Sequence, residues 1–138
     1  MAIIVDSGPL LAALDRDEDD HRACLDLLST AKEPLVVPAS VIVEVDHFVR
    51  RRLDPDVHLS FLRDVAQGAI CVEPLTMEDY RRIVELCAKY ADQDIGLVDA
   101  SVVAIAERLN EPKIATLDRR HFSIIRPRHV DAFQLLPE

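Results

Sequence analysis

Short runs of β-branched and other apolar residues alternate with longer helix-like segments along the whole chain, and this alternation constrains the fold more than any other feature. The runs predicted as strands are residues 2–5, 35–38, 70–72, 112–117 and 133–136. Strands that alternate with helices form a parallel sheet with helices packed on it. We therefore expect an α/β, three-layer fold, in which a central, mostly parallel sheet of about four or five strands carries helices on both faces.

The segment Gly96–Leu109 is the most apolar of the predicted helices, and between Leu97 and Ala106 its only polar side chains are Asp99 and Ser101. A helix that is apolar on nearly every face is buried on all sides. Asp99, in the first turn, is favoured there by the helix dipole, which needs no function. The alternative is that this carboxylate is kept in an apolar setting because it binds a paired charge or a metal ion.

The length of 138 residues suits one domain, so we expect residues 1–138 to form a single unit. No apolar run approaches the length of a membrane span, and the first residues lack the basic start and long apolar core of a signal peptide. The three cysteines, Cys24, Cys71 and Cys87, fit neither a disulfide framework nor a zinc site. We expect all three to be small core residues of a cytoplasmic protein.

The formal net charge of −9 excludes a domain that holds nucleic acid by charge alone. It does not exclude an enzyme that acts on nucleic acid through metal ions and contacts the phosphates with local basic patches. The candidate patches are Arg50–Arg52, Arg81–Arg82 and Arg119–Arg120. A solvated helix face explains any one of them equally well.

Two carboxylates, Asp6 and Glu44, lie next to or within apolar segments, and a surface role explains Glu44 poorly. Asp6 follows the first predicted strand, where it either caps the next helix or lies at the ligand-binding edge of an open α/β sheet. Glu44 lies within the apolar sequence VIVEV of a predicted helix and has no Lys or Arg at the preferred helical spacing. By contrast, Asp46 precedes Arg50 by one turn, so we expect these two to form an ordinary surface ion pair.

Three later acids are predicted near helix starts. Asp79 follows Thr76 by three residues, which is an acidic variant of the capping box. Asp94 either caps the buried helix that carries Asp99 or lies at the edge of the site, and we expect the cap. Asp118 directly follows the fourth strand, so it either caps the short helical turn after it or lies at the same edge of the sheet as Asp6.

In a parallel α/β sheet, the carboxyl ends of the strands share one edge with the amino ends of the helices that follow. We therefore expect one acidic cluster at that edge, made of Asp6, Glu44, Asp99 and Asp118. Carboxylates crowded together repel one another unless a cation lies between them. An all-oxygen ligand set favours a hard cation such as Mg²⁺ or Mn²⁺.

These motifs resemble those of PIN domains, and more closely those of the VapC toxins of type II toxin–antitoxin pairs. The matching pieces are Asp6 after the first strand, Glu44 in VIVEV, Asp99 in GLVDASVVAIAE, and TLDRRHF at Thr116–Phe122. The resemblance covers essentially the whole chain, and the order and spacing of all the acids agree. The chain departs from the family pattern at Ser7-Gly8-Pro9, where Thr-Ser is commoner after the first acid.

The resemblance implies a PIN-like nuclease domain that acts as a Mg²⁺- or Mn²⁺-dependent endoribonuclease. Asp6 and Asp99 would be the principal metal ligands, and Glu44 and Asp118 would complete the catalytic pocket. The resemblance also implies an RNA substrate, a homodimer, and a cognate VapB-type antitoxin that silences the enzyme.

Two alternatives stay open. A phosphatase-like or receiver-like α/β domain with an acidic pocket fits poorly, because Gly8 stands where the phosphatase needs a second Asp, and Asp118 stands where the receiver needs a Lys. A catalytically silent PIN-fold binding module would usually have lost one of the acids, and none is missing here.

Overall fold

The computed structural model describes every residue from Met1 to Glu138. The strands are β1 (Ile3–Val5), β2 (Leu35–Pro38), β3 (Cys71–Glu73), β4 (Lys113–Ala115) and β5 (Gln134–Leu136). The helices are α1 (Ser7–Leu14), α2 (His21–Thr30), α3 (Ala39–Arg52), α4 (Pro55–Ala66), α5 (Met77–Lys89), α6 (Leu97–Leu109) and α7 (Arg119–Ile124), with a short 3-10 helix, η1 (Ala91–Gln93). Each predicted strand is present, with ends that differ from the prediction by at most two residues; β2 has the predicted bounds.

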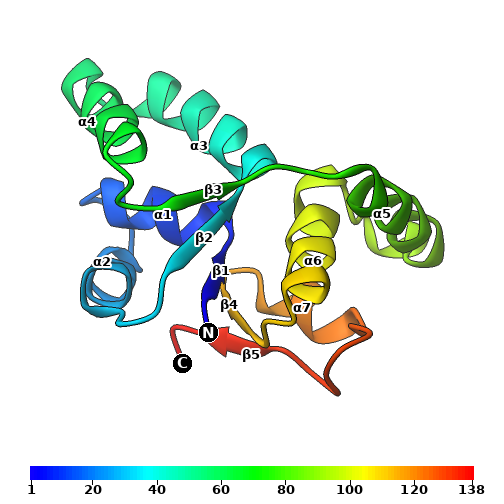
Figure 1. Ribbon diagram of the computed structural model, residues 1–138. Coiled ribbons are helices and arrows are strands. Elements are labelled where there is room, and N and C mark those ends of the chain that lie inside the picture. The colour runs from blue at the N-terminus through cyan, green and yellow to red at the C-terminus, as the bar shows by residue number, and fades with distance from the viewer.

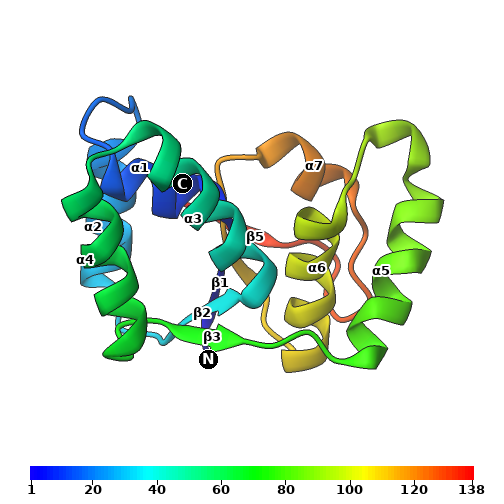
Figure 2. The same ribbon diagram turned by 90° about the horizontal axis from the view of Figure 1, so that it is seen from above.

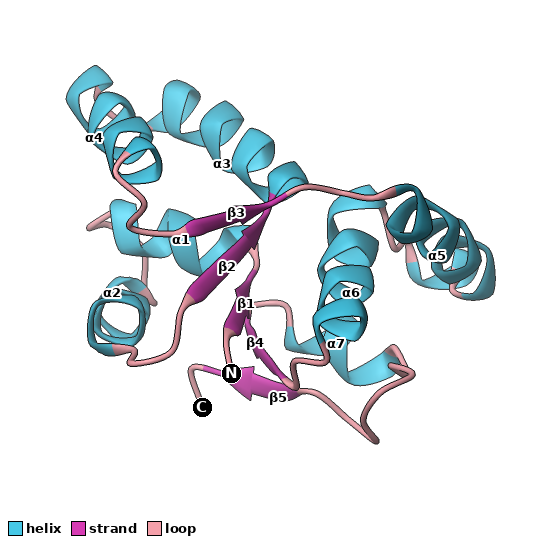
Figure 3. Ribbon diagram, viewed as in Figure 1, coloured by secondary structure: helices cyan, strands magenta, loops and turns pink.

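The five strands form one sheet in the order β3-β2-β1-β4-β5 (Figure 3). Every neighbouring pair is parallel, so the sheet is parallel throughout rather than mostly parallel. A parallel pair needs a crossover connection, and each connection between successive strands here contains at least one helix. The alternation in the sequence therefore has a direct structural cause.

Helices cover both faces of this sheet, which confirms the predicted three layers. Seen from above, α1 to α4 lie on one side of the sheet and α5 to α7 on the other (Figure 2). Helix α6 contacts β1 and β2 directly, and α5 packs on the outer side of α6 (Figure 1). All residues from Ala100 to Ala106 are buried, as the apolar pattern predicted.

The starts of two helices show where cap prediction succeeded and where it was wrong. Helix α5 begins with the predicted capping box, in which the Asp79 amide donates to the Thr76 hydroxyl (3.1 Å) and the Thr76 amide donates to the Asp79 carboxylate (3.0 Å). Asp94 does not cap α6, because Gly96 occupies that position. Instead Asp94 ends η1 in the left-handed conformation (φ 55°), which a short polar side chain tolerates.

The cysteines are free thiols, and they differ in burial. Cys24 is buried and Cys87 is partly buried, but Cys71 is exposed, so the prediction of three core cysteines was wrong for Cys71. The reason is that β3 is an edge strand, paired only with β2. None of the helices has the length and apolar character needed to cross a bilayer.

Candidate active site

The structure brings the acidic cluster together at the carboxyl edge of the sheet. Asp6 directly follows β1, and Asp118 is the N-cap residue of α7, shortly after β4. Asp99 lies in the first turn of α6, and Glu44 lies in α3, which begins directly after β2. The four carboxylates are close enough to interact electrostatically. Burial raises the pKa of Asp99, and the negative charges of Asp6, Asp118 and Glu44 raise it further.

Asp6 is the most deeply buried acid of the cluster, with only 5% of the residue exposed. Its Oδ2 accepts a hydrogen bond from the Thr116 hydroxyl (2.8 Å), whereas its Oδ1 is buried and has no hydrogen-bond partner. Burial raises the pKa of Asp6, and the charges of Glu44 and Asp118 act in the same direction. Asp6 occupies the N-cap position of α1 without making a side-chain cap bond, so capping does not explain this carboxylate.

Thr116 links two members of the cluster. Its hydroxyl donates to Asp6 and accepts a hydrogen bond from the backbone N–H of Asp118 (3.0 Å). The residue itself is buried, with 1% exposed. No role for Thr116 was predicted from the sequence, and its place at the start of TLDRRHF was the only signal.

Glu44 reaches the cluster from α3 and accepts a hydrogen bond from the Ser7 hydroxyl. This bond fixes the Glu44 carboxylate and links α3 to α1, two helices that pack against each other. A second hydroxyl contact joins α3 to α6, where Ser40 Oγ lies 2.6 Å from Ser101 Oγ. Ser40 lies one turn before Glu44 on α3, and Ser101 lies two residues after Asp99 on α6. The contact between the two serines therefore sets the spacing of the helices that carry these acids.

Asp118 fills both of the roles that were left open. Its Oδ1 accepts the backbone N–H of His121 (3.1 Å), which is an N-cap bond, and its Oδ2 lies 2.6 Å from His121 Nδ1. The same Nδ1 lies 3.8 Å from Asp99 Oδ2. The hydrogen bond to Asp118 raises the pKa of His121. His121 was not predicted as a site residue, although it follows Asp118 by three residues, the spacing of neighbours on a helix.

Comparison with known proteins agrees with this geometry. The PIN domain family matches residues 3–126 of the chain. The chain is 36% identical over 135 residues to Ribonuclease VapC26 of Mycobacterium tuberculosis, covering 98% of this chain and all of that protein. The chain is a PIN-domain protein of the VapC type.

Solved structures share the fold of this VapC-type protein. Mycobacterium tuberculosis VapC20, a toxin that cleaves the sarcin-ricin loop, is similar with a TM-score of 0.75 and 16% identity over 82% of this chain and 87% of that one. VapBC2 from Rickettsia felis, solved with a DNA fragment from its promoter, gives a TM-score of 0.71 and 16% identity over 98% of both chains. At these identities the likeness shows the fold alone.

The donor set of the VapC-type chain fits a hard divalent cation. The cluster offers carboxylate oxygens from separate elements, and one of them, Asp6 Oδ1, is buried without any partner. A buried and unpaired carboxylate oxygen is costly unless a cation or a proton satisfies it. The pKa of Asp99 is raised to about 6, first by burial and then by the neighbouring charges, which is the repulsion that a bound cation would relieve.

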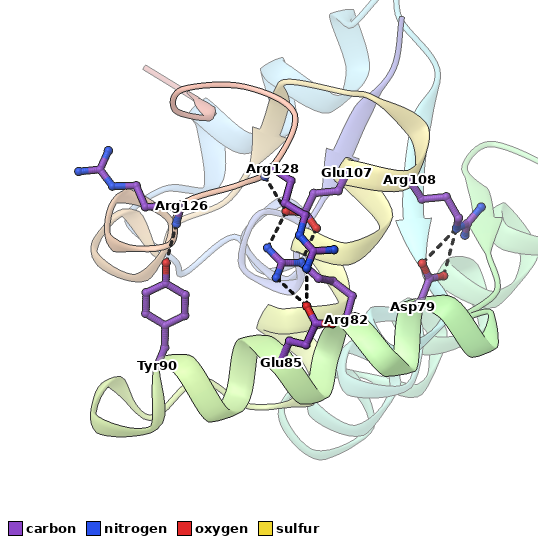
Figure 4. Close-up of polar contacts among 8 residues, drawn as sticks. All are labelled: Asp79, Arg82, Glu85, Tyr90, Glu107, Arg108, Arg126 and Arg128. Carbon is purple, nitrogen blue, oxygen red and sulfur yellow. Dashed lines mark hydrogen bonds and ion pairs between the residues drawn. The ribbon is translucent and has the colours of Figure 1, made fainter.

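The candidate arginine patches differ in how free their side chains are. Arg82 donates to both carboxylate oxygens of Glu107 (2.8 and 3.0 Å) and to Glu85 (3.2 Å), as Figure 4 shows, and Arg81 pairs with Glu78. Arg82 is therefore held within the α5–α6 layer, whereas Arg81 forms an exposed pair within α5, and contact of either arginine with phosphates stays a prediction.

Of the other two patches, one lies beside the acidic cluster and the other lies at the end of α3. Arg119 and Arg120 are exposed and directly follow Asp118, so they flank the acids. Arg50, Arg51 and Arg52 form the last turn of α3, beyond Glu44. The expected surface pair of Asp46 with Arg50 is replaced by a pair with His58 of α4 (2.5 Å), because the packing of α4 brings the imidazole to that carboxylate.

Proposed function

We propose that this chain is a Mg²⁺- or Mn²⁺-dependent endoribonuclease and the toxin of a type II toxin–antitoxin pair. The observation that carries the proposal is the convergence of Asp6, Glu44, Asp99 and Asp118 at one edge of the sheet in a chain of the VapC type. Residues 1–138 act as one PIN-like nuclease domain, and the relative Ribonuclease VapC26 is of matching length.

The residues of the cluster have separate roles in this proposal. Asp6 and Asp99 would hold the cation, because Asp6 Oδ1 has no other partner and because burial and the neighbouring carboxylates raise the pKa of Asp99 to about 6. The chemistry that Mg²⁺ or Mn²⁺ would supply at these residues is Lewis acidity, which would lower the pKa of a water molecule and offset negative charge on the phosphate. Glu44, fixed by Ser7, and Asp118, fixed by its own helix, complete the pocket around the scissile bond.

The RNA backbone is held by side chains beside the acids. Arg119 and Arg120 are exposed at the start of α7, within two residues of Asp118. A protein with a net charge of −9 repels phosphates over most of its surface, so local arginines next to the cation carry this contact. An acidic pocket that opens at a sheet edge suits single-stranded or looped RNA better than a duplex.

Two protein partners belong to the proposal. A cognate VapB-type antitoxin silences the enzyme, and solved relatives such as the Klebsiella pneumoniae toxin–antitoxin complex support such a partner. A second copy of the chain forms a homodimer. We further infer that the enzyme acts in the cytoplasm, since its proposed substrate is RNA and its cysteines are free thiols.

The test measures cleavage of a mixed single-stranded RNA substrate with Mg²⁺ or Mn²⁺ and with a chelator. Asp6→Asn and Asp99→Asn are each expected to lower the metal-dependent rate by at least about 100-fold, because each removes a metal ligand. Asp46→Asn is the matched control: it neutralises another acid of α3, one that pairs with His58 outside the cluster, and it should cleave like the wild type.

The outcome also separates the proposal from a silent binding module. Wild-type rates in both Asp6→Asn and Asp99→Asn would refute the assignment of the site. Absence of cleavage by the folded wild-type protein, across RNA substrates and both metals, would favour the binding module instead.

A further inference from the structure

His121 is the one nitrogen donor at the acidic cluster. Its Nδ1 lies 2.6 Å from Asp118 Oδ2 and 3.8 Å from Asp99 Oδ2. The proposed metal centre uses carboxylates alone and leaves this imidazole with structural contacts only, to Asp118 and to the backbone of Gln93.

The imidazole forms a compact donor group with two of the acids. One ligand atom each from Asp99, Asp118 and His121 lie within 4.8 Å of one another, and no other group of three or more such side chains in the chain does so. A second observation points to a cation here. Asp6, whose charge acts on Asp99, is 5% exposed and has a buried Oδ1 with no partner.

We infer that His121 supplies a nitrogen ligand to the metal centre, so that the site prefers Mn²⁺ to Mg²⁺. The inference rests on the proposed function for the existence of the centre. The chemical reason is that imidazole binds transition-metal ions well, whereas Mg²⁺ takes oxygen ligands almost exclusively. Nδ1 and Asp118 Oδ2 lie 2.6 Å apart and form a hydrogen bond, and a cation bound by both atoms would take the place of the proton in that bond, which would pass to the solvent.

A second histidine shows what a purely structural pair looks like. His58 Nε2 lies 2.5 Å from Asp46 Oδ1, on α4 and α3, with no third donor side chain within reach. The two pairs are chemically alike, but only His121 lies beside further carboxylates. His58→Asn is therefore a matched control for His121→Asn.

The test uses the full chain loaded with Mn²⁺ and needs no RNA. Electron spin echo envelope modulation detects a ¹⁴N nucleus bound directly to Mn²⁺, and labelling the wild type with ¹⁵N-histidine assigns that signal to an imidazole without any substitution. We expect a directly bound histidine nitrogen in the wild type and in His58→Asn, and none in His121→Asn. Calorimetry should show Mn²⁺ affinity lowered by about 10-fold or more in His121→Asn, with Mg²⁺ affinity little changed.

The possible failures are distinguishable. Mn²⁺ bound to the wild type without any histidine nitrogen overturns the inference and leaves His121 as a residue that only orients Asp118. A nitrogen signal that persists in folded His121→Asn also overturns it. If the wild type binds neither Mn²⁺ nor Mg²⁺ at millimolar concentrations, the metal centre of the proposed function fails together with this inference.

Discussion

Single side chains at this site serve the local backbone and the cluster at the same time. Asp118 caps α7 and also faces Asp99 through His121. Thr116 directly follows β4, accepts a hydrogen bond from the backbone of Asp118 and donates one to Asp6. A cap and a site residue are therefore not competing interpretations, because a carboxylate has two oxygens and each can serve a different partner.

Asp99 is expected to destabilise the fold in the absence of metal. Its pKa, raised from 3.8 to about 6 by burial and then by Asp6 and Asp118, corresponds to a penalty of about 3 kcal/mol when the group is ionised. In chelator at pH 7.5, Asp99→Asn should therefore be more stable than the wild type by about 1–3 kcal/mol in urea unfolding.

The sign of the pH dependence follows from the raised pKa. The penalty on the wild type is complete above the folded value of about 6 and is relieved as the pH falls from there toward 3.8. The advantage of Asp99→Asn should shrink over that same interval. Asp46→Asn, which removes an acid paired with His58, should give no such gain, and equal stability of Asp99→Asn and wild type at pH 7.5 would contradict the repulsion.

At the scale of whole elements, the strands and helices were predictable because each follows a local pattern. The apolar run of β2 and the capping box of α5 depend on residues a few positions apart. Partners between elements depend on packing, which no local pattern contains. For this reason Asp46 pairs with His58 of α4 instead of Arg50, and Asp94 bends the chain instead of capping α6.

The candidate site was predictable only in part, for the same reason. The positions of the acids follow from the shared edge of a parallel sheet, which is a rule of topology. The roles of Thr116, Ser40 and His121 depend on side-chain distances between elements and became visible only in the structure.

The attachment of α5 to the rest of the molecule is expected to depend on Arg108. Arg108 Nε donates to both oxygens of Asp79 (3.1 and 3.2 Å), a residue that is 2% exposed (Figure 4). Arg108→Ala leaves this buried carboxylate without its charged partner, so we expect a loss of about 2–3 kcal/mol in urea unfolding. Arg81→Ala, which breaks an exposed pair with Glu78, should cost no more than about 0.5 kcal/mol.

The Arg108–Asp79 pair depends on pH in the opposite direction to Asp99. A falling pH removes the stabilisation that this pair provides, whereas it relieves the destabilisation by Asp99. Burial alone would raise the pKa of Asp79, but the bonds and charge of Arg108, together with Thr76, lower it below its usual value. The contribution of the pair is therefore complete above pH 3.8 and disappears as the pH falls through the lower folded value. In Arg108→Ala, burial raises the pKa of the unpaired Asp79, so the effect should be largest at pH 7 and should shrink as falling pH protonates that carboxyl group; an effect that stays constant down to pH 3 would contradict this account.

At the scale of the whole molecule, the charge distribution predicts how metal affects stability. The net charge is −9, and no lysine or arginine forms an ion pair with Asp6, Glu44, Asp99 or Asp118, whose only such partner is His121. The acidic cluster therefore relies on a cation for compensation. Saturating Mg²⁺ or Mn²⁺ should raise the melting temperature measurably, because a ligand that binds only the folded state stabilises it by mass action. Asp6→Asn should lose this response, and an unchanged wild-type melting curve at millimolar metal would count against the site.

We expect the second copy of the chain in the proposed homodimer to bind at the surface between α3 and α5. An apolar groove of about 690 Å³ lies there, with apolar lining residues Ala39, Val43, Phe48, Pro74, Leu75, Leu97 and Val98. Val43 is 71% exposed and Leu97 is 49% exposed, an arrangement that is costly on a free surface. Glu44 lines the same groove, so a copy bound there would border the acidic cluster.

A charge placed in this groove tests the homodimer. Val43→Glu should shift the molecular mass in light scattering from dimer to monomer and weaken association by at least about 10-fold, because dimerisation would bury the new carboxylate. The matched control is Leu59→Glu, which charges an apolar side chain of α4 that is 48% exposed and lies outside the groove. A monomeric wild type would contradict the homodimer itself. A dimer that persists in Val43→Glu but dissociates in Leu59→Glu would move the interface from the α3–α5 groove to α4.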